Sequence, residues 1–215
     1  QTLVSTPDRH LVFFGTETTI GTTSTQDDMY IRFSDQESIN ATTSYAPSAT
    51  NTAGTQRLAD GTRIVAAIRG RDAIYIWTDT SLFIMRFVGA PFVFSFQQVG
   101  TNCGLIGKNA AVEVDGSAYW MSENGFFRYT GKLDSLACLV EDYVYDDINT
   151  VPRQHIYAGL NNLFGEVTWF YPGSGAASNN RSVTYNYMDS SPERPVWTTS
   201  TLARSSWSDS HIFGK

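Results

Sequence analysis

Residues 62–98 read TRIVAAIRGRDAIYIWTDTSLFIMRFVGAPFVFSFQQ, and this stretch decides the fold. It contains four apolar runs rich in the residue types that fit a pleated, half-buried surface: Ile64–Ile68, Ala73–Trp77, Leu82–Val88 and Phe92–Phe96. Short segments with Gly, Asp, Ser or Pro separate them, as expected of strands joined by tight turns. A helix would need a longer periodic stretch without such breakers. The stretch therefore predicts a four-stranded antiparallel meander.

The rest of the chain repeats this pattern. An aromatic residue in an apolar run, followed by polar residues and a turn, recurs at Phe33, Trp77, Trp120 and Trp169, with spacings of 44, 43 and 49 residues. Four strands in roughly 45 residues is the period of a β-propeller blade. The sequence predicts an all-β protein, a β-propeller built of four-stranded antiparallel blades with a repeat of about 44 residues. A large β-sandwich or barrel is the alternative.

The repeat sets expected boundaries along the chain. The predicted blades span approximately residues 10–60, 62–100, 108–140 and 154–200, with a partial blade at 202–215. Residues 36–60 are long, polar and poorly periodic, which predicts a projecting loop that could carry contacts. The chain begins at Gln1 rather than Met and ends as if cut in mid-element. We therefore expect it to be a piece of a longer polypeptide.

One segment departs from the strand pattern. Between residues 139 and 148, apolar residues recur at helical spacing, and Pro152 lies just beyond them. This predicts one short helix near 139–148. Its expected apolar face comprises Leu139, Val140, Tyr143, Val144 and Ile148.

Composition excludes some classes of protein. The net charge of −6 and the isoelectric point near 5.0 argue against a protein that binds nucleic acid stably, which would carry a basic face. No apolar run approaches the length of about 18 residues that a membrane-spanning helix needs. Cys103 and Cys138 are the only cysteines and form no metal-binding pattern. We expect both to be buried reduced thiols, consistent with assembly in a cytosol.

The sequence offers little for catalysis. His10, His155 and His211 are isolated and lack the spacing of zinc ligands. Asp27–Asp28 lacks the pattern of a calcium loop. No catalytic, cofactor-binding or metal-ligating residue is predicted, and the protein is not expected to be an enzyme.

Three further groups of residues have structural interpretations. The acidic pairs Glu141–Asp142 and Asp146–Asp147 fit a solvated helix face better than an acid/base pair. Arg63, Arg69 and Arg71 fit surface or inter-subunit ion pairs. The tryptophans could form a sugar platform, but their repeat spacing favours core positions between blades: Trp77, Trp120, Trp169 and Trp197.

Several motifs resemble a family of tail proteins of tailed, mainly short-tailed, bacteriophages. The similarity covers about residues 10–209 and marks strands and turns. The motifs are LVFFG (11–15), IRFSDQE (31–37), SATNTAGTQRL (48–58), residues 61–96, YWMSENGFFRYTGK (119–132), VEDYVYDDIN (140–149), EVTWFYP (166–172) and VWTTSTLARSSW (196–207).

The resemblance implies a structural virion protein, the nozzle or hub of the viral tail. As such a protein it would form a homo-oligomeric ring, expected to be a hexamer, assembled in the host bacterial cytoplasm. DNA would pass transiently and non-specifically along its axis during DNA ejection. Other faces would bind the tail adaptor or upper tail ring and the tail fibre proteins. The acidic composition agrees with such a conduit, because Lys and Arg on its wall would retain DNA.

Two other functions remain open from the sequence. The first is a carbohydrate-binding or glycoside-cleaving propeller that recognises the host surface. The second is a cellular propeller scaffold that binds peptides. Rotational symmetry distinguishes them, because a tail component forms a closed ring and a lone propeller does not.

Overall fold

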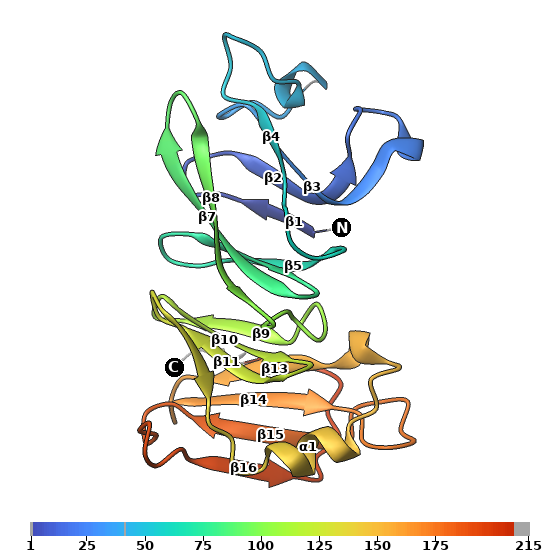
Figure 1. Ribbon diagram of the computed structural model, residues 1–215, viewed down its shortest axis with the longest axis vertical. Helices are drawn as coiled ribbons and strands as arrows, with labels where there is room; N and C mark the ends of the chain where they lie inside the picture. The colour runs from blue at the N-terminus through green and yellow to red at the C-terminus, as the bar shows by residue number, and fades with distance from the viewer. Residues whose placement is uncertain (1, 41, 209–215) are drawn as a thin grey trace. The chain divides into compact units, whose positions relative to one another are not determined.

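The computed structural model describes residues 2–40 and 42–208 (Figure 1). In these residues the chain forms four four-stranded antiparallel sheets, each a meander of four consecutive strands. We call them blades 1 to 4. Their strands are β1 (Thr2–Ser5), β2 (Leu11–Glu17), β3 (Gln26–Phe33) and β4 (Gly54–Arg57) in blade 1; β5 (Ile64–Arg69), β6 (Ile74–Thr78), β7 (Ser81–Gly89) and β8 (Val93–Thr101) in blade 2; β9 (Ala111–Val114), β10 (Ser117–Ser122), β11 (Gly125–Tyr129) and β12 (Leu133–Leu136) in blade 3; and β13 (Tyr157–Asn161), β14 (Glu166–Tyr171), β15 (Arg181–Asn186) and β16 (Trp197–Ser200) in blade 4. The predicted all-β class and blade-like sheets are confirmed, and they are consistent with a β-propeller fold.

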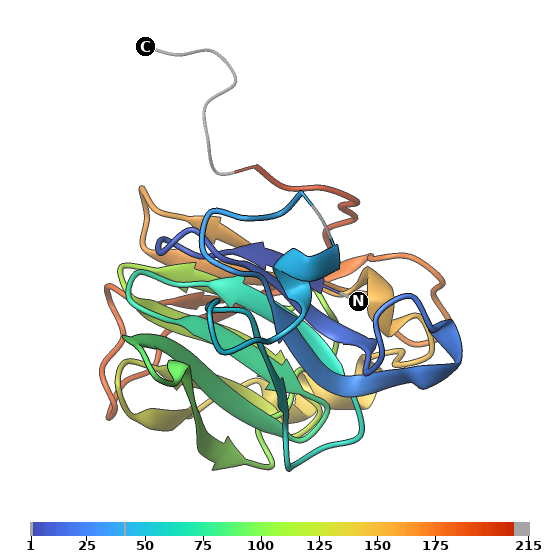
Figure 2. The same ribbon diagram turned by 90° about the horizontal axis from the view of Figure 1, so that it is seen from above.

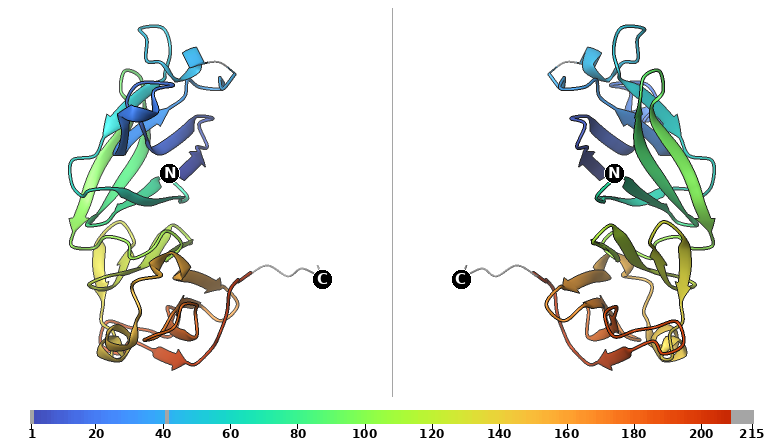
Figure 3. Two further views of the ribbon diagram at one scale, coloured as in Figure 1. Left: turned by 90° about the vertical axis from the view of Figure 1, so that its right-hand side faces the viewer. Right: turned by 90° about the vertical axis from the view of Figure 1, so that its left-hand side faces the viewer.

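Blade 2 contains all four strands predicted from the 62–98 stretch. Its second strand, β6, is buried along its whole length, as the run IYIWT requires. The turn from β6 to β7 is closed by Thr78, whose Oγ1 accepts a hydrogen bond from the Ser81 backbone N–H at 2.8 Å. The last two strands, β7 and β8, have nine residues each and form the longest hairpin among the described strands (Figure 3).

The chain divides into two compact units, one ending at Gly104 and the other beginning at Leu105. In the first unit, blades 1 and 2 lie side by side, with β1 next to β5 (Figure 2). One hydrophobic core joins the two sheets, and Phe33 of β3 meets Phe94 of β8 edge to face with ring centroids 4.9 Å apart. Packing of this kind explains why the apolar positions recur on every strand.

The second unit joins blades 3 and 4 through aromatic residues. Phe126 of β11 contacts Trp169 of β14 and Trp197 of β16, with ring centroids 5.0 and 4.8 Å apart. The indole Nε1 of Trp169 also donates a hydrogen bond to the backbone carbonyl of Ala110 at 3.0 Å. Side-chain packing and a buried hydrogen bond therefore fix these two sheets against each other.

The aromatic repeat is confirmed in blades 2, 3 and 4. Trp77, Trp120 and Trp169 are each the fourth residue of the second strand, and each is completely buried. The predicted alignment with Phe33 is wrong, because Phe33 lies on the third strand of blade 1. The matching position on β2 is Phe14, which is also buried. A long connection between β3 and β4 displaces this blade from the regular spacing.

Blade 1 differs from its predicted boundaries. It begins with β1, before the expected start at residue 10, and β1 pairs with β2 through Val4 and Val12. The predicted loop at 36–60 contains the fourth strand, β4, and a 3-10 helix, η2 (Thr42–Tyr45). Leu58 is buried, so this end of the segment belongs to the core. Figure 1 shows η2 and the neighbouring turns standing beyond the sheet.

Two other predicted boundaries are corrected. Blade 3 was predicted to extend to residue 140, but its last strand, β12, occupies Leu133–Leu136. An outer strand needs few buried side chains, and Leu136 alone of β12 is buried. The partial blade expected at 202–215 contains no strand within residues 202–208, and residues 209–215 lie outside the described residues. Instead, Trp207 packs back onto blade 4 through Gly159.

The predicted short helix is confirmed as α1 (Glu141–Asp147). Its expected apolar face is wrong in part, because Leu139 and Tyr143 are largely exposed and only Val144 is buried within the helix. Tyr145 attaches α1 to blade 3: its hydroxyl lies 2.7 Å from the Ser122 carbonyl oxygen and 3.0 Å from that of Gly125. A polar anchor therefore replaces the expected apolar stripe.

The Tyr145 hydroxyl is expected to contribute to the free energy of unfolding. Tyr145→Phe removes the donor for both carbonyl groups, so the free energy of unfolding should fall by about 1–2 kcal/mol. Urea titration followed by circular dichroism measures the change. Tyr143→Phe is the matched control on the same helix, because Tyr143 is exposed and should tolerate the change. Equal effects of the two substitutions would show that the Tyr145 hydroxyl is not an anchor.

Candidate contact surfaces

The three histidines have separate environments. His10 is buried in the first unit with 2% of its surface exposed. His155 is exposed in the second unit, and its Nδ1 donates to the Ala177 carbonyl at 2.8 Å. His211 lies outside the described residues. No group of three or more His, Cys, Asp or Glu side chains within residues 2–40 and 42–208 is arranged to hold a metal ion.

The acidic residues singled out in the sequence are engaged locally. Asp147 accepts a hydrogen bond from Arg181 Nε at 2.9 Å. Asp27 accepts from Arg57 Nε at 2.7 Å and from the Met29 backbone N–H. Burial opposes ionisation of Asp27, but the Met29 and Arg57 hydrogen bonds outweigh it and lower its pKa. The ionised Asp27 side chain of β3 therefore pairs with Arg57 and links β3 to β4.

Glu141 has the opposite shift. Burial and, to a lesser extent, the neighbouring Asp142 raise its pKa. Its carboxylate lies close to Gly125, against the turn of blade 3. A single perturbed carboxyl group against a turn is not an acid/base pair, which needs two groups that face the same substrate.

The predicted core role is confirmed for Trp77, Trp120 and Trp169, whereas Trp197 is only partly buried. Trp77, Trp120 and Trp169 expose no surface, so they cannot stack on a sugar. Trp197 lies between Phe126 and Tyr185 and donates from Nε1 to the Ala137 carbonyl at 2.8 Å. Arg63, Arg69 and Arg71 form no ion pair with any described residue.

The two cysteines are free thiols, as expected, although Cys138 is only partly buried. Burial raises the pKa of Cys103 to about 11 and that of Cys138 to about 12. Both are therefore protonated at neutral pH, and a protonated thiol is a poor nucleophile.

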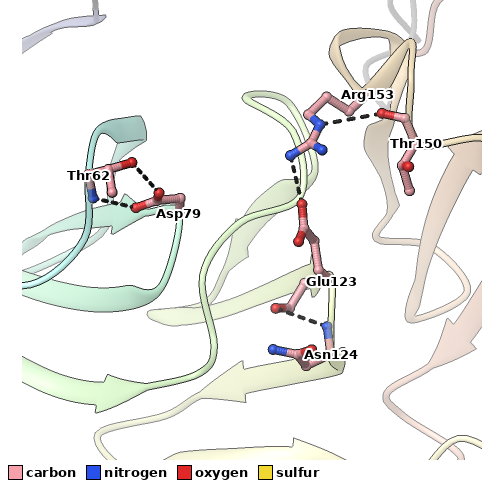
Figure 4. A network of polar contacts seen from close by, with 7 residues as sticks. Thr62, Asp79, Glu123, Asn124, Thr150 and Arg153 are labelled. Carbon is pink, nitrogen blue, oxygen red and sulfur yellow. Dashed lines mark hydrogen bonds and ion pairs between the residues drawn. The ribbon is translucent and has the colours of Figure 1, made fainter.

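Polar contacts organise the loops between strands (Figure 4). Asp79, after β6, accepts hydrogen bonds from the backbone N–H and the hydroxyl of Thr62 at 2.8 and 2.5 Å. In the second unit, Arg153 pairs with Glu123 at 2.6 Å and donates to the Thr150 carbonyl. Such contacts hold the loops in fixed positions from which exposed side chains can reach a partner.

The β7–β8 hairpin carries three of the exposed large apolar side chains of the first unit. Its tip reads FVGAPF from Phe87 to Phe92 and contains no charged residue. Phe92 is 78% exposed, and Phe87 and Val88 are also exposed. The opposite side of the hairpin is buried, because Phe94 packs on blade 1 through Phe33. We call Phe87, Val88 and Phe92 the hairpin tip. An apolar group on an anchored hairpin is typical of a contact surface.

A second apolar patch lies at the end of blade 4. Leu163 and Phe164 form the turn between β13 and β14, and Met188 follows β15. Met188 lies directly over Gly165, where an added Cβ would come within 2.3 Å of its Cγ. The backbone N–H of Tyr187 fixes this arrangement by donating to the Gly165 carbonyl at 2.7 Å. All three apolar side chains are more than half exposed.

Clefts occur in both units. The larger, of about 760 Å³, lies beside the start of β13 and the segment 203–207. The smaller, of about 280 Å³, lies in the first unit beneath Phe87 and Phe94, next to Arg71. The larger cleft could not be predicted from the sequence, because the residues that line it are distant along the chain: 109, 155, 179 and 204–207. Only the return of the chain after β16 brings them together.

His10 is the buried end of a chain of hydrogen bonds that continues through the partly exposed Thr52 and Asp35. Its Nε2 lies 3.2 Å from Thr52 Oγ1, and Thr52 Oγ1 donates to Asp35 at 2.7 Å. Since the single hydroxyl proton of Thr52 points to Asp35, His10 Nε2 is the donor in the first contact. The imidazole ring also packs edge-on against Phe94 with centroids 5.0 Å apart. The neutral form of His10 therefore fits this site.

The environment of His10 predicts a pH dependence. Burial lowers its pKa, although the carboxylates of Asp8 and Asp35 raise it. A histidine with a lowered folded pKa stabilises the fold fully above its unfolded pKa of about 6.5, and this stability is lost as the pH falls below that value. We expect the urea midpoint of the first unit to fall between about pH 7.5 and 5.5.

Two substitutions test this dependence. His10→Gln should flatten the pH profile, because the titrating group is absent. His155→Gln, at the exposed histidine of the other unit, should leave the profile unchanged. A profile that stays steep in His10→Gln would assign the effect to another group.

None of the helices among the described residues has the length and apolarity needed to cross a membrane. A comparison of the chain with protein-family models and with curated protein sequences finds no match.

Proposed function

We propose that this chain is a structural component of a bacteriophage tail, part of the nozzle or hub ring. In this role it forms part of the conduit for DNA ejection and an attachment platform for other tail proteins. The observation that carries the proposal is the hairpin tip: an uncharged apolar surface on the longest hairpin of the described strands, anchored to the core that joins blades 1 and 2. A subunit of a permanent assembly needs such surfaces, because obligate interfaces are more apolar than the remaining protein surface.

The motifs that resemble tail proteins of short-tailed phages give the proposal its particular form. They fall mainly on the strands and turns of the four blades, and one of them falls on α1. A scaffold protein depends on its packing, so similarity concentrated in the strands agrees with a scaffold. The excess of 21 Asp and Glu over 15 Lys and Arg agrees with a conduit past which DNA slides without being retained.

Electron microscopy of the full-length protein, or of the particle that contains it, tests the proposal. We expect class averages with rotational symmetry, a ring of about six copies and a central channel. Isolated single propellers would overturn the proposal. They would leave a carbohydrate-binding propeller or a peptide-binding scaffold as the function to test next, by glycan array and by peptide capture.

The hairpin tip allows a second test by substitution. Phe92→Asp places a charge on the most exposed side chain of the tip, and burying an unpaired charge in an interface costs several kcal/mol. We expect the full-length variant to fold but to remain monomeric in sedimentation experiments. Val151→Asp, at another highly exposed apolar residue, is the control and should assemble normally. Normal rings formed by Phe92→Asp would remove the hairpin tip from the interface.

A further inference from the structure

The larger cleft of the second unit contains an aromatic platform. Trp207 donates from Nε1 to the Leu160 carbonyl at 2.9 Å and lies flat on Gly159. A Cβ at residue 159 would come within 2.7–2.9 Å of three atoms of the indole, so only glycine allows this contact. The indole is nevertheless 40% exposed. An indole fixed on one face and open to solvent elsewhere is pre-organised to stack on a ligand.

The buried ring of Phe170 connects Trp207 to a second aromatic residue of the cleft, Tyr157. Phe170 lies 5.7 Å from Trp207 and 4.9 Å from Tyr157, measured between ring centroids. Both Tyr157 and Trp207 line the cleft. The cleft volume of about 760 Å³ lies within the range of roughly 300–1,000 Å³ found for small-molecule sites. A ligand of two or three sugar rings is of this size.

Polar groups with unsatisfied hydrogen-bonding capacity line the same cleft. The Asn179 side chain is 93% buried and its Nδ2 donates to the His155 carbonyl at 2.7 Å, but its Oδ1 has no partner among the described residues. The Tyr157 hydroxyl likewise has no partner in the described part of the chain. Both atoms are shielded from solvent, and an unsatisfied buried polar group costs about 1–3 kcal/mol, so a ligand hydroxyl group that reaches either atom would gain by pairing with it.

The charge of the cleft is opposite to that of the whole chain. Arg204 lines it and forms no ion pair with any described residue. No aspartate or glutamate is found among the described residues that line it. Burial raises the pKa of Tyr157 while Arg204 acts in the opposite direction, which places the guanidinium charge near the phenol. In a protein of net charge −6, the described lining of this cleft therefore carries a local positive charge.

We propose that this cleft binds an acidic saccharide, a polyhydroxylated ring system that carries a carboxylate. Trp207 stacks on a sugar ring, Arg204 pairs with the carboxylate, and Asn179 and Tyr157 bond to ring hydroxyl groups. Carboxylic acids of the protein are absent from the described wall of the cleft. Most glycoside hydrolases use two of them, so the proposal is for binding of the saccharide without cleavage. This binding site is separate from the proposed role in tail assembly. The assembly proposal rests on the hairpin tip of the first unit, whereas all residues of this site belong to the second unit.

The experiment is a titration of the chain with 3′-sialyllactose and with trigalacturonate, followed by calorimetry and tryptophan fluorescence. Lactose is the matched neutral ligand, because it is 3′-sialyllactose without the acidic sugar. We expect at least one acidic saccharide to saturate below about 10 mM, and lactose to bind at least about tenfold more weakly.

Substitutions assign the contacts. In Arg204→Gln, the ratio of the affinity for the acidic saccharide to the affinity for lactose should fall to about one. Trp207→Ala should weaken binding of the acidic saccharide at least about tenfold. Arg194→Gln and Phe164→Ala change an exposed arginine and an exposed aromatic outside the cleft and should bind normally. Circular dichroism verifies that each variant is folded.

Three results would overturn the proposal. The first is no saturable binding of either acidic saccharide, and the second is binding that neither Arg204→Gln nor Trp207→Ala changes. The third is equally tight binding of inorganic phosphate, which would show a simple anion site. Release of reducing sugar during the titration would show that the saccharide is cleaved, and it would contradict the proposal of binding without cleavage.

Discussion

Trp169→Ala is expected to lower the free energy of unfolding of the second unit by about 3–5 kcal/mol. Trp169 exposes no surface and contacts Phe126 of blade 3 and Trp197 of its own blade. Removal of the indole leaves a cavity at the junction of blades 3 and 4 that the paired strands cannot close. The Nε1 hydrogen bond to Ala110 is lost as well.

Trp169→Phe separates these contributions. It keeps an aromatic ring in the core and removes the hydrogen bond, so its effect should be smaller than that of alanine. Phe164→Ala, at an exposed aromatic residue of the same unit, should change the stability by less than about 0.5 kcal/mol. Urea titration of the three variants by circular dichroism gives the comparison. A loss of less than about 1 kcal/mol in Trp169→Ala would show that the indole does not join the two sheets.

Gly104→Ala has the second largest expected effect, a loss of about 3 kcal/mol in the first unit. A Cβ at residue 104 would lie 2.0 Å from the Asp79 carbonyl oxygen and 2.5 Å from the Thr80 backbone nitrogen. These are backbone atoms of the β6–β7 turn, so no side chain can rotate to make room. The neighbouring hydrogen bond from Cys103 N–H to the Thr80 carbonyl would be displaced with them.

The matched control is Gly175→Ala, where an added Cβ meets no atom within 4 Å but φ is +74°. This substitution should cost about 1 kcal/mol through backbone strain alone. Thermal and urea unfolding of the two variants therefore separate steric overlap from backbone conformation. Similar losses in both would show that the turn moves aside and that the close approach is unimportant.

Short-range patterns of the sequence predicted the blades because a strand is a local structure. In the 62–98 stretch, each apolar run bounded by turn residues became a strand, from β5 to β8. The tryptophan repeat correctly placed the core of blades 2, 3 and 4, because a side chain facing the next sheet must recur once in each blade. These inferences needed only strand periodicity and turn chemistry.

The errors occurred where distant contacts outweigh local patterns. Phe33 matched the repeat in spacing but lies on β3, because the connection to β4 has no fixed length. Leu139 and Tyr143 had the spacing of an apolar helix face, yet the Tyr145 hydroxyl holds α1 in place and leaves them exposed. An edge strand such as β12 has one buried residue, too few for a recognisable pattern.

The sequence by itself determined the all-β class, the four-stranded meanders, the short helix and the buried tryptophans, because each follows from periodicity over a few residues. The tertiary structure alone decided which apolar residues remain exposed at the hairpin tip and which polar residues meet in the cleft of blade 4. Asn179 and Trp207 are 28 residues apart and have no pattern in common. They line the same cleft because the chain turns back across blade 4 after β16 and because Gly159 leaves room for the indole.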